Sequence, residues 1–409
     1  MSCKAQMRST LLLALGLAGM FIGMVFSPVI LSLATIVAIA GLTLEGRRLD
    51  WQWYTPLRGL VRDPLFWGLV GLYLVMFVSS WLTEDWGYLL ERLRIKLPLL
   101  LLPVAWARVA FDQSGGEQLA TGARRLLCGF VALVVAGVLL NYGLHFAEIN
   151  AGMVRGQPLP VPRDNHVRFS LLVAISSVVG LHGAYRYRDR WLLVMGSFLF
   201  VALHLLAVRT GLITAYLGLT VVVVWAGTQD GKHKAVILSL LGLVALPTLA
   251  YLTVPTFRAK LQYTRYELLH RNPADDPAEY SDEGRLTSIR IGLAVWRRHP
   301  WWGVGYGNLQ QVMDEQYARY VPGTPGKRPH NQFVSALAAG GLVGGVITLG
   351  CFALLGWGGG RWRDPLYFAL WTMLTASCLV ENTLETSVGV TLFTLTFLLF
   401  GYPPYRKPG

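Results

Sequence analysis

The sequence predicts an all-α integral membrane protein with about twelve transmembrane helices and one long loop. Of the 409 residues, 54% are hydrophobic and only 14% are charged, which is too apolar for a soluble globular domain of this length. The apolar runs are continuous rather than alternating, which favours helices over the strands of a membrane barrel. We therefore expect residues 1–409 to form a single membrane domain.

Charged clusters divide the chain into apolar runs, and these runs, with their flanks, are long enough as helices to cross a hydrocarbon core of about 30 Å. The predicted spans are 10–26, 28–44, 65–82, 93–110, 125–144, 167–185, 191–208, 211–228, 235–254, 331–356, 365–380 and 386–402. Between the ninth and tenth spans, the polar segment 253–331 cannot lie in hydrocarbon, because lipid leaves its charges and backbone groups unsatisfied. We expect it to be a loop in water that contains amphipathic helices.

The basic residues indicate the orientation of the chain in the membrane. They gather in alternate connections, as the positive-inside rule expects of cytoplasmic loops. We therefore attribute the net charge of +13 to membrane topology, expect no nucleic acid partner, and predict cytoplasmic termini with the loop 253–331 on the far side. The cytoplasmic basic residues are Arg47, Arg48, Arg58, Arg62, Arg108, Arg124, Arg125, Arg186, Arg188, Arg190, Lys232, Lys234, Arg361, Arg363, Arg406 and Lys407.

Several far-side segments are also basic, where that rule expects few basic residues. Arg209 lies where two apolar helices meet with almost no loop between them. Its planar guanidinium suits phosphate, although an arginine at a helix end can also reach out to lipid headgroups. The other far-side residues that we expect to contribute to substrate binding are Arg163, Arg168, Arg265, Arg290, Asn308 and Asn331.

Within the loop, two features carry candidate chemistry. Residues 284–296 have apolar side chains at helical spacing with Arg285 and Arg290 near one end, which predicts an amphipathic helix lying on the bilayer; such basic residues often hold headgroups. His330 precedes an apolar helical run, and at a helix N-terminus the dipole favours a neutral imidazole that can act as a base. The alternative is an ordinary surface histidine. Glu381 and Glu385 either pair with the arginines or cap helices.

The sequence predicts neither a metal nor a cofactor. The four cysteines are scattered without metal-ligand or disulfide spacing. The far side also lacks the motifs of serine acyl transfer, of zinc hydrolysis and of a nucleotide sugar held by divalent metal. The glycines at 303, 305 and 307 resemble a phosphate loop, but no strand precedes them, so a tight turn anchored by Trp301 and Trp302 is the better interpretation.

Three segments in order resemble the O-antigen ligase and polymerase superfamily. The patterns hP-x-x-GvG-x-Gn and HN-x-x-l-x-x-x-a-x-x-Gl-x-G are weak alone and fairly specific together. Where many relatives have an acidic residue before the Gly-Leu pair, this chain has Ala339-Gly340-Gly341, which leaves the role of that acid open. The segments are 207–212 (AVRTGL), 284–308 with its end HPWWGVGYGN, and 330–344 (HNQFVSALAAGGLVG).

The resemblance implies a glycosyltransferase of the bacterial inner membrane with its active site on the periplasmic side. Its donor would be a glycan on undecaprenyl diphosphate, and a ligase would transfer that glycan to a sugar hydroxyl of lipid A-core. Arg209 and Arg285 would hold the diphosphate and His330 would be the base for the acceptor. Because arginines can supply the positive charge, we expect a metal-independent transfer with inversion.

Three alternatives remain open at this level. An O-antigen polymerase shares the same motifs, and a protein-glycosylating relative belongs to the same superfamily. A transporter of an anionic lipid-linked sugar would also need outward-facing arginines. It would usually show internal repeats and broken helices at the midplane, whereas the charges here gather at one face.

Overall fold

Over the residues that it describes, the computed structural model has helices as its regular elements apart from one two-residue antiparallel pair, in which β1 (Leu44–Glu45) lies beside β2 (Arg48–Leu49) with Leu44 opposite Leu49. This confirms the predicted helical class. The residues that the structure describes are 3–45, 48–49, 59–111, 113–154, 157, 159–229, 231–255, 257–258, 261–262, 265 and 281–402.

Each predicted span coincides with a helical segment. Among the residues that the structure describes, six helical segments are long and apolar enough to cross a membrane, and five shorter helices are also apolar. The chain is therefore a membrane protein, while the count of twelve spans stays a prediction. The helices at the predicted spans are α1 (Cys3–Phe26), α2 (Pro28–Thr43), α4 (Pro64–Leu74) with η2 (Val75–Phe77) and η3 (Ser80–Leu82), α6 (Pro98–Phe111), α7 (Gln113–Leu144), α9 (His166–Tyr187), α10 (Arg190–Leu206), α11 (Arg209–Gln229), α12 (His233–Thr253), α16 (Gln332–Trp357), α17 (Pro365–Val380) and α18 (Ser387–Gly401).

The remaining helices lie in the connections between these spans. The middle of the predicted loop, 266–280, falls outside the described residues. The connecting helices are α5 (Trp86–Lys96), α8 (Phe146–Val154), η4 (Pro162–Asp164), α14 (Ser281–Arg298), α15 (Leu309–Tyr320), η5 (Gly358–Arg363) and η6 (Thr383–Glu385).

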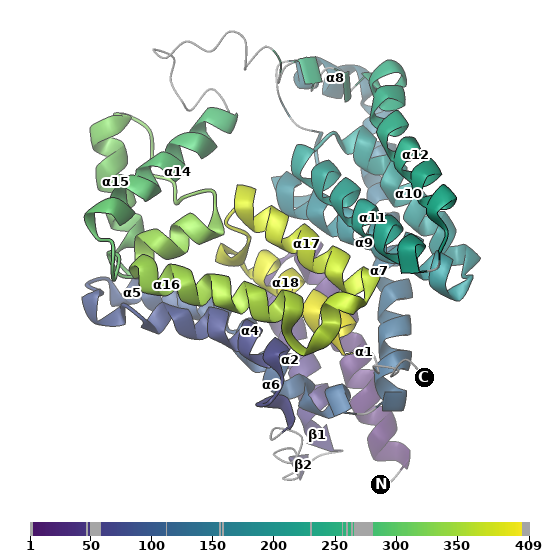
Figure 1. Ribbon diagram of the computed structural model, residues 1–409, viewed down its shortest axis with the longest axis horizontal. Helices are drawn as coiled ribbons and strands as arrows, with labels where there is room; N and C mark the ends of the chain where they lie inside the picture. The colour runs from purple at the N-terminus through teal and green to yellow at the C-terminus, as the bar shows by residue number, and fades with distance from the viewer. Residues whose placement is uncertain are drawn as a thin grey trace.

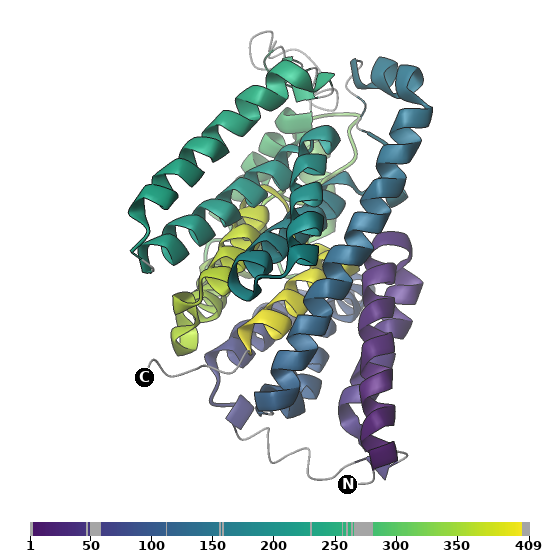
Figure 2. The ribbon, with the colours of Figure 1, turned by 90° about the vertical axis from the view of Figure 1, so that its right-hand side faces the viewer.

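The helices fall into groups around a buried centre. Figure 1 shows α16, α17 and α18 between a group formed by α9 to α12 and the polar helices α14 and α15. Figure 2 shows the pair α1 and α2 beside the long helix α7. In the centre, Tyr367, Phe393 and Phe397 are fully buried, whereas α12 buries only Ala250 and turns its other apolar side chains outward, where lipid can cover them. Most residues of α9 and nearly all residues of α18 are buried, so these two helices form much of the interior.

Packing between α9, α11 and α17 fixes which helix ends lie together. Gly211 of α11 faces Ser170 near the start of α9, and seven residues later Gly218 faces both Val178 of α9 and Met373 of α17. Trp225, another seven residues along α11, contacts Phe368 of α17. Hence α9 and α11 run parallel, α17 runs antiparallel to them, and the starts of α9 and α11 share a level with the end of α17.

A loop docks into a kink in α16. Gly341 adopts φ of +64° and interrupts the helix, which frees backbone groups on both sides of it. The N–H groups of Val304 and Gly305 donate to the carbonyls of Ala338 and Ala339 at 3.0 and 2.9 Å, and the N–H of Leu342 donates to the Pro300 carbonyl at 2.7 Å. The tight turn predicted at 303–307 is thus present and it completes the hydrogen bonding of the kink.

Substitution of Gly341 should destabilise this joint. An alanine there would have to adopt φ of +64° and ψ of −161°, a backbone conformation essentially restricted to glycine that costs about 1–3 kcal/mol, and its Cβ would collide with the Trp301 carbonyl. We expect Gly341→Ala to lower the thermal unfolding temperature in detergent. The matched control is Gly350→Ala in the same helix, where an added Cβ meets nothing within 4 Å and should be neutral or slightly stabilising. Equal unfolding temperatures for the two variants would contradict the proposed role of the kink.

Candidate functional site

His330 lies at the start of α16, as the sequence predicts, and its neighbour Asn331 fixes it there. The Asn331 carboxamide oxygen caps the helix by accepting from the N–H groups of Phe333 and Val334 at 2.9 and 3.0 Å. Its amide nitrogen donates to the carbonyl of Leu379 at 2.8 Å. Asn331 therefore ties the start of α16 to the end of α17, two residues before Glu381.

Glu381 joins His330 and Arg285 in one cluster. Nδ1 of His330 donates to Oε2 of Glu381 at 3.1 Å, while Nε and Nη2 of Arg285 contact Oε1 at 3.0 and 2.8 Å. Ser288 of α14 supports both partners, because its hydroxyl accepts from the His330 backbone N–H at 3.0 Å and donates to the Arg285 carbonyl at 2.7 Å. The cluster thus links α14, α16 and the end of α17.

The charge of Glu381 determines which tautomer the neutral ring of His330 adopts. Burial opposes this charge, but the hydrogen bond from His330 and the charge of Arg285 outweigh it and hold the pKa of the Glu381 carboxyl below its ordinary value. An ionised carboxylate only accepts hydrogen bonds, so in the neutral ring Nδ1 carries the proton and Nε2 keeps a lone pair. With 26% of its side chain exposed, His330 can be reached by a substrate.

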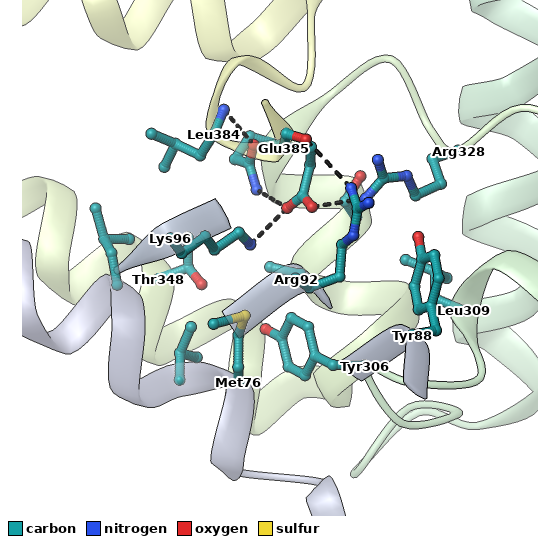
Figure 3. A pocket seen from close by; sticks show the side chains of 15 residues that line it. Met76, Tyr88, Arg92, Lys96, Tyr306, Leu309, Arg328, Thr348, Leu384 and Glu385 are labelled. Carbon is teal, nitrogen blue, oxygen red and sulfur yellow. Dashed lines mark hydrogen bonds and ion pairs between the residues drawn. The ribbon is translucent and has the colours of Figure 1, made fainter. Parts of the chain in front are cut away.

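Glu385, four residues further along the chain in η6, is the centre of a second cluster (Figure 3). Lys96 and Arg328 each contact its carboxylate at 2.6 Å, and Gln332 donates to it at 3.2 Å. Burial opposes the charge, yet Lys96 and Arg328 lower the pKa of Glu385 to about 2. The cavity that these residues line has a volume of about 20 Å³, enough for about one water molecule.

Arg168 and Arg209 lie at the same end of the bundle. The charge of Arg168 contributes to the lowered pKa of Glu381, which places the two side chains near each other. Arg209 is the first residue of α11, and the antiparallel packing of α11 on α17 brings it to the level of Glu381. The structure therefore gathers Arg168, Arg209, Arg285 and His330, which the sequence predicts as site residues, around the end of α17.

The other predicted site residues have different surroundings. Arg163 is exposed and lines a small pocket together with Arg168. Arg290 lies 3.5 Å from Glu283 on the exposed side of α14, and Arg265 is exposed. Their role in substrate binding stays a prediction.

Asn308 holds a loop in place. Its carboxamide oxygen accepts from the backbone of Glu84 and Asp85 at 2.8 and 3.4 Å, and its nitrogen donates to the carbonyls of Leu82 and Val304 at 2.7 and 3.1 Å. Because both ends of the amide are occupied, this geometry favours a structural role over the predicted contact with substrate.

The second cluster contains residues that the sequence analysis did not assign to the site. Arg92 donates to the Glu385 carbonyl at 3.3 Å, alongside the ion pairs of Lys96 and Arg328 with the carboxylate. One signal was available, since Arg92 and Lys96 are four residues apart, as are Glu381 and Glu385. Such spacing puts the two cations on one helix face.

The arrangement suits a reaction on an anionic substrate. Six cations, from Arg92, Lys96, Arg168, Arg209, Arg285 and Arg328, lie at this end with the carboxylates Glu381 and Glu385. Among the described residues, no group of three or more His, Cys, Asp or Glu side chains could hold a metal ion. A histidine with an available lone pair next to excess positive charge can remove a proton while the cations bind a negatively charged group.

Comparison with known proteins agrees with the resemblance seen in the sequence. Residues 192–349 match the family model described as O-antigen ligase, a family that includes ligases and polymerases. The matched segment contains Arg209, Arg285 and His330. No curated protein matches the chain.

Loss of the Glu385 charge should destabilise the protein in a pH-dependent way. Glu385→Gln leaves buried Lys96 and Arg328 without their carboxylate, which should cost about 3–5 kcal/mol of unfolding free energy at neutral pH. Because the pKa falls from 4.5 to about 2 in the folded protein, this stabilisation is present above pH 4.5 and is lost as the pH falls towards 2. Thermal unfolding of both proteins across this range measures it.

The control for this prediction is Glu283→Gln, which removes a partly exposed partner of Arg290 and should cost less than about 1 kcal/mol. If Glu385→Gln unfolds at the wild-type temperature at pH 7, the buried ion pairs do not stabilise the fold.

Proposed function

We propose that the protein is an O-antigen ligase, from the premise that residues 192–349 match the family model described as O-antigen ligase. In this proposal it transfers a glycan from undecaprenyl diphosphate to a sugar hydroxyl of lipid A-core. The observation that carries the proposal is the hydrogen-bonded pair of His330 and Glu381 within a group of cations at one end of the helix bundle.

The acceptor hydroxyl would lose its proton to Nε2 of His330. Glu381 holds the ring through Nδ1 and would stabilise the imidazolium that forms when the proton is transferred. Ser288 and Asn331 keep the backbone of His330 in place. The deprotonated oxygen would attack the anomeric carbon of the donor sugar directly, which inverts that centre.

The cations would act on the leaving group. A diphosphate departs readily once its developing charge is neutralised, and arginine forks bind phosphate oxygens in pairs. Arg209 and Arg285 are the proposed diphosphate ligands, with Arg168 and Arg328 adding positive charge nearby. In this account the reaction needs no divalent metal, and Arg163, Arg265 and Arg290 would help to bind the lipid-linked glycan.

The proposed orientation puts this end of the bundle at the periplasmic face of the inner membrane and both termini in the cytoplasm. It rests on the basic residues of the alternate connections, which gather at the opposite ends of α9, α11 and α17. The segment 253–331, which carries α14 and α15, would then be the long periplasmic loop between the ninth and tenth spans.

A product assay tests the function and separates ligase from polymerase. Purified protein would be incubated with lipid-linked glycan, with and without lipid A-core, in excess chelator. We expect glycan joined to lipid A-core only when the acceptor is present. Lengthening of the glycan without acceptor would instead identify the polymerase alternative. If neither product forms, glycan transfer is wrong.

Substitutions of His330 and of Glu381 should lower turnover in a non-additive way. We expect His330→Ala to lower turnover about 10²–10⁴-fold by removing the base, with donor binding unchanged. Glu381→Gln should also lower turnover, and the double variant should be no slower than His330→Ala alone, because Glu381 acts through His330. Single-turnover kinetics with lipid-linked glycan measure these rates. If the two losses in turnover multiply in the double variant, Glu381 does not act through His330. Glu283→Gln is the control.

The proposed diphosphate ligands should show a different defect. We expect Arg209→Ala and Arg285→Ala each to weaken donor binding roughly 10–100-fold and to lower turnover as well, because each removes a charge-assisted contact. Lysine at either position should rescue only in part, since an ammonium lacks the planar fork. Arg319→Ala, an exposed residue of α15, is the control. Normal donor binding by both alanine variants would show that these arginines only hold headgroups.

A further inference from the structure

A second basic cavity lies at the far end of the same helices. It has a volume of about 610 Å³ and is enclosed by the ends of α9, α11 and α18 and the start of α17. Its charged and titratable lining residues are Arg124, His182, Arg186, Arg188, Lys232 and Asp364. Four of these six carry a positive charge and one carries a carboxylate.

This cavity is separate from the His330 site. Asp364 and Pro365, at the start of α17, line the cavity, whereas Glu381 directly follows the last residue of that helix. The 16 residues of α17 span about 24 Å at the helical rise of 1.5 Å per residue. The two sites therefore lie at opposite ends of the bundle, and the cavity faces the side that the basic connections predict to be cytoplasmic.

Arg124 has an unusual environment in this cavity. It is only 6% exposed, and its Nε makes no hydrogen bond to any described residue. The contacts that the described residues give its guanidinium are with the rings of Tyr187 and Phe400, 5.0 and 5.6 Å from the ring centres. Its neighbour Arg125, by contrast, makes two hydrogen bonds to Asp189 at 2.9 and 2.8 Å.

A buried guanidinium without a carboxylate is costly unless another anion pairs with it. Asp364 does not serve Arg124 in this way, because among the described residues it makes no ion pair and its Oδ1 accepts from the N–H of Tyr367 at 2.8 Å, capping α17. Nδ1 of the buried His182 also lacks a hydrogen-bond partner among the described residues. The cavity therefore presents buried polar atoms without a hydrogen-bond partner among the described residues, together with excess positive charge.

We propose that this cavity binds a phosphate group, carried either by an anionic lipid headgroup or by a soluble phosphate. Phosphate fits because several arginines can each offer a planar fork to its oxygens, and because the volume falls in the range of small-molecule sites. Basic pockets between membrane helices on the cytoplasmic side are also suited to lipid headgroups. Arg124 is the central ligand, and Arg186, Arg188 and Lys232 stand at the exposed mouth.

Thermal unfolding of the delipidated full chain in neutral detergent tests this site. Sodium phosphate would be titrated against sodium chloride at equal ionic strength, and dioleoyl phosphatidylglycerol against dioleoyl phosphatidylcholine. We expect phosphatidylglycerol, phosphate or both to raise the unfolding temperature of the wild type by about 2–5 °C. A shift with both probes means that the phosphate group suffices, and a shift with phosphatidylglycerol alone means a lipid headgroup.

Variants then connect the shift to the cavity. Arg124→Gln should abolish the shift, while the control Arg125→Gln should keep it, since Arg125 pairs with Asp189 outside the cavity. If Arg124→Gln does not fold, the double variant Arg186→Gln/Arg188→Gln at the mouth should weaken binding at least about 10-fold. The proposal is overturned if neither probe exceeds its control, or if the variants that fold respond like the wild type.

Discussion

The carboxylate of Glu381 is the contact on which the geometry of the candidate site depends. Its two oxygens are divided between His330, which lies two residues before α16, and Arg285 of α14. Without this acceptor, the imidazole would have no fixed tautomer and the guanidinium of Arg285 would lose its ion pair with Glu381. One side chain at the end of α17 therefore sets the orientation of the candidate base and holds the polar helix α14 against the membrane helices.

The kink in α16 at Gly341 is a second constraint on the position of His330. The loop before α15 completes the backbone hydrogen bonds that the kink at Gly341 leaves open, so the first turns of α16 can diverge from the rest of that helix. His330 sits at the start of those turns, and Asn331 ties them to α17. The glycines of the two motifs thus shape the backbone that carries the candidate base.

The sequence was sufficient to predict the helices, and it predicted some of the residues that the structure brings together around Glu381. Hydrocarbon requires every backbone group to be satisfied within its own segment, so apolar length alone predicts helices at all the expected spans. His330 and Arg285 were found from local motifs. The partner of Lys96 is 289 residues away, however, and a pairing at that separation depends on how the helices pack. For the same reason the sequence could not decide whether Glu381 and Glu385 pair or cap.

The cations at the two ends of the bundle have different partners. Carboxylates pair with them at the His330 end, whereas Arg124 at the opposite end contacts the rings of Tyr187 and Phe400. At the His330 end, two buried carboxylates hold several of the cations in place before any substrate arrives, which pre-organises the site. In the proposed reaction, a diphosphate that binds Arg285 competes with Glu381 for the same guanidinium. Its arrival would leave more of the Glu381 charge to His330 at the moment when that histidine must accept a proton. Donor binding and the readiness of the base would then be coupled through a single arginine.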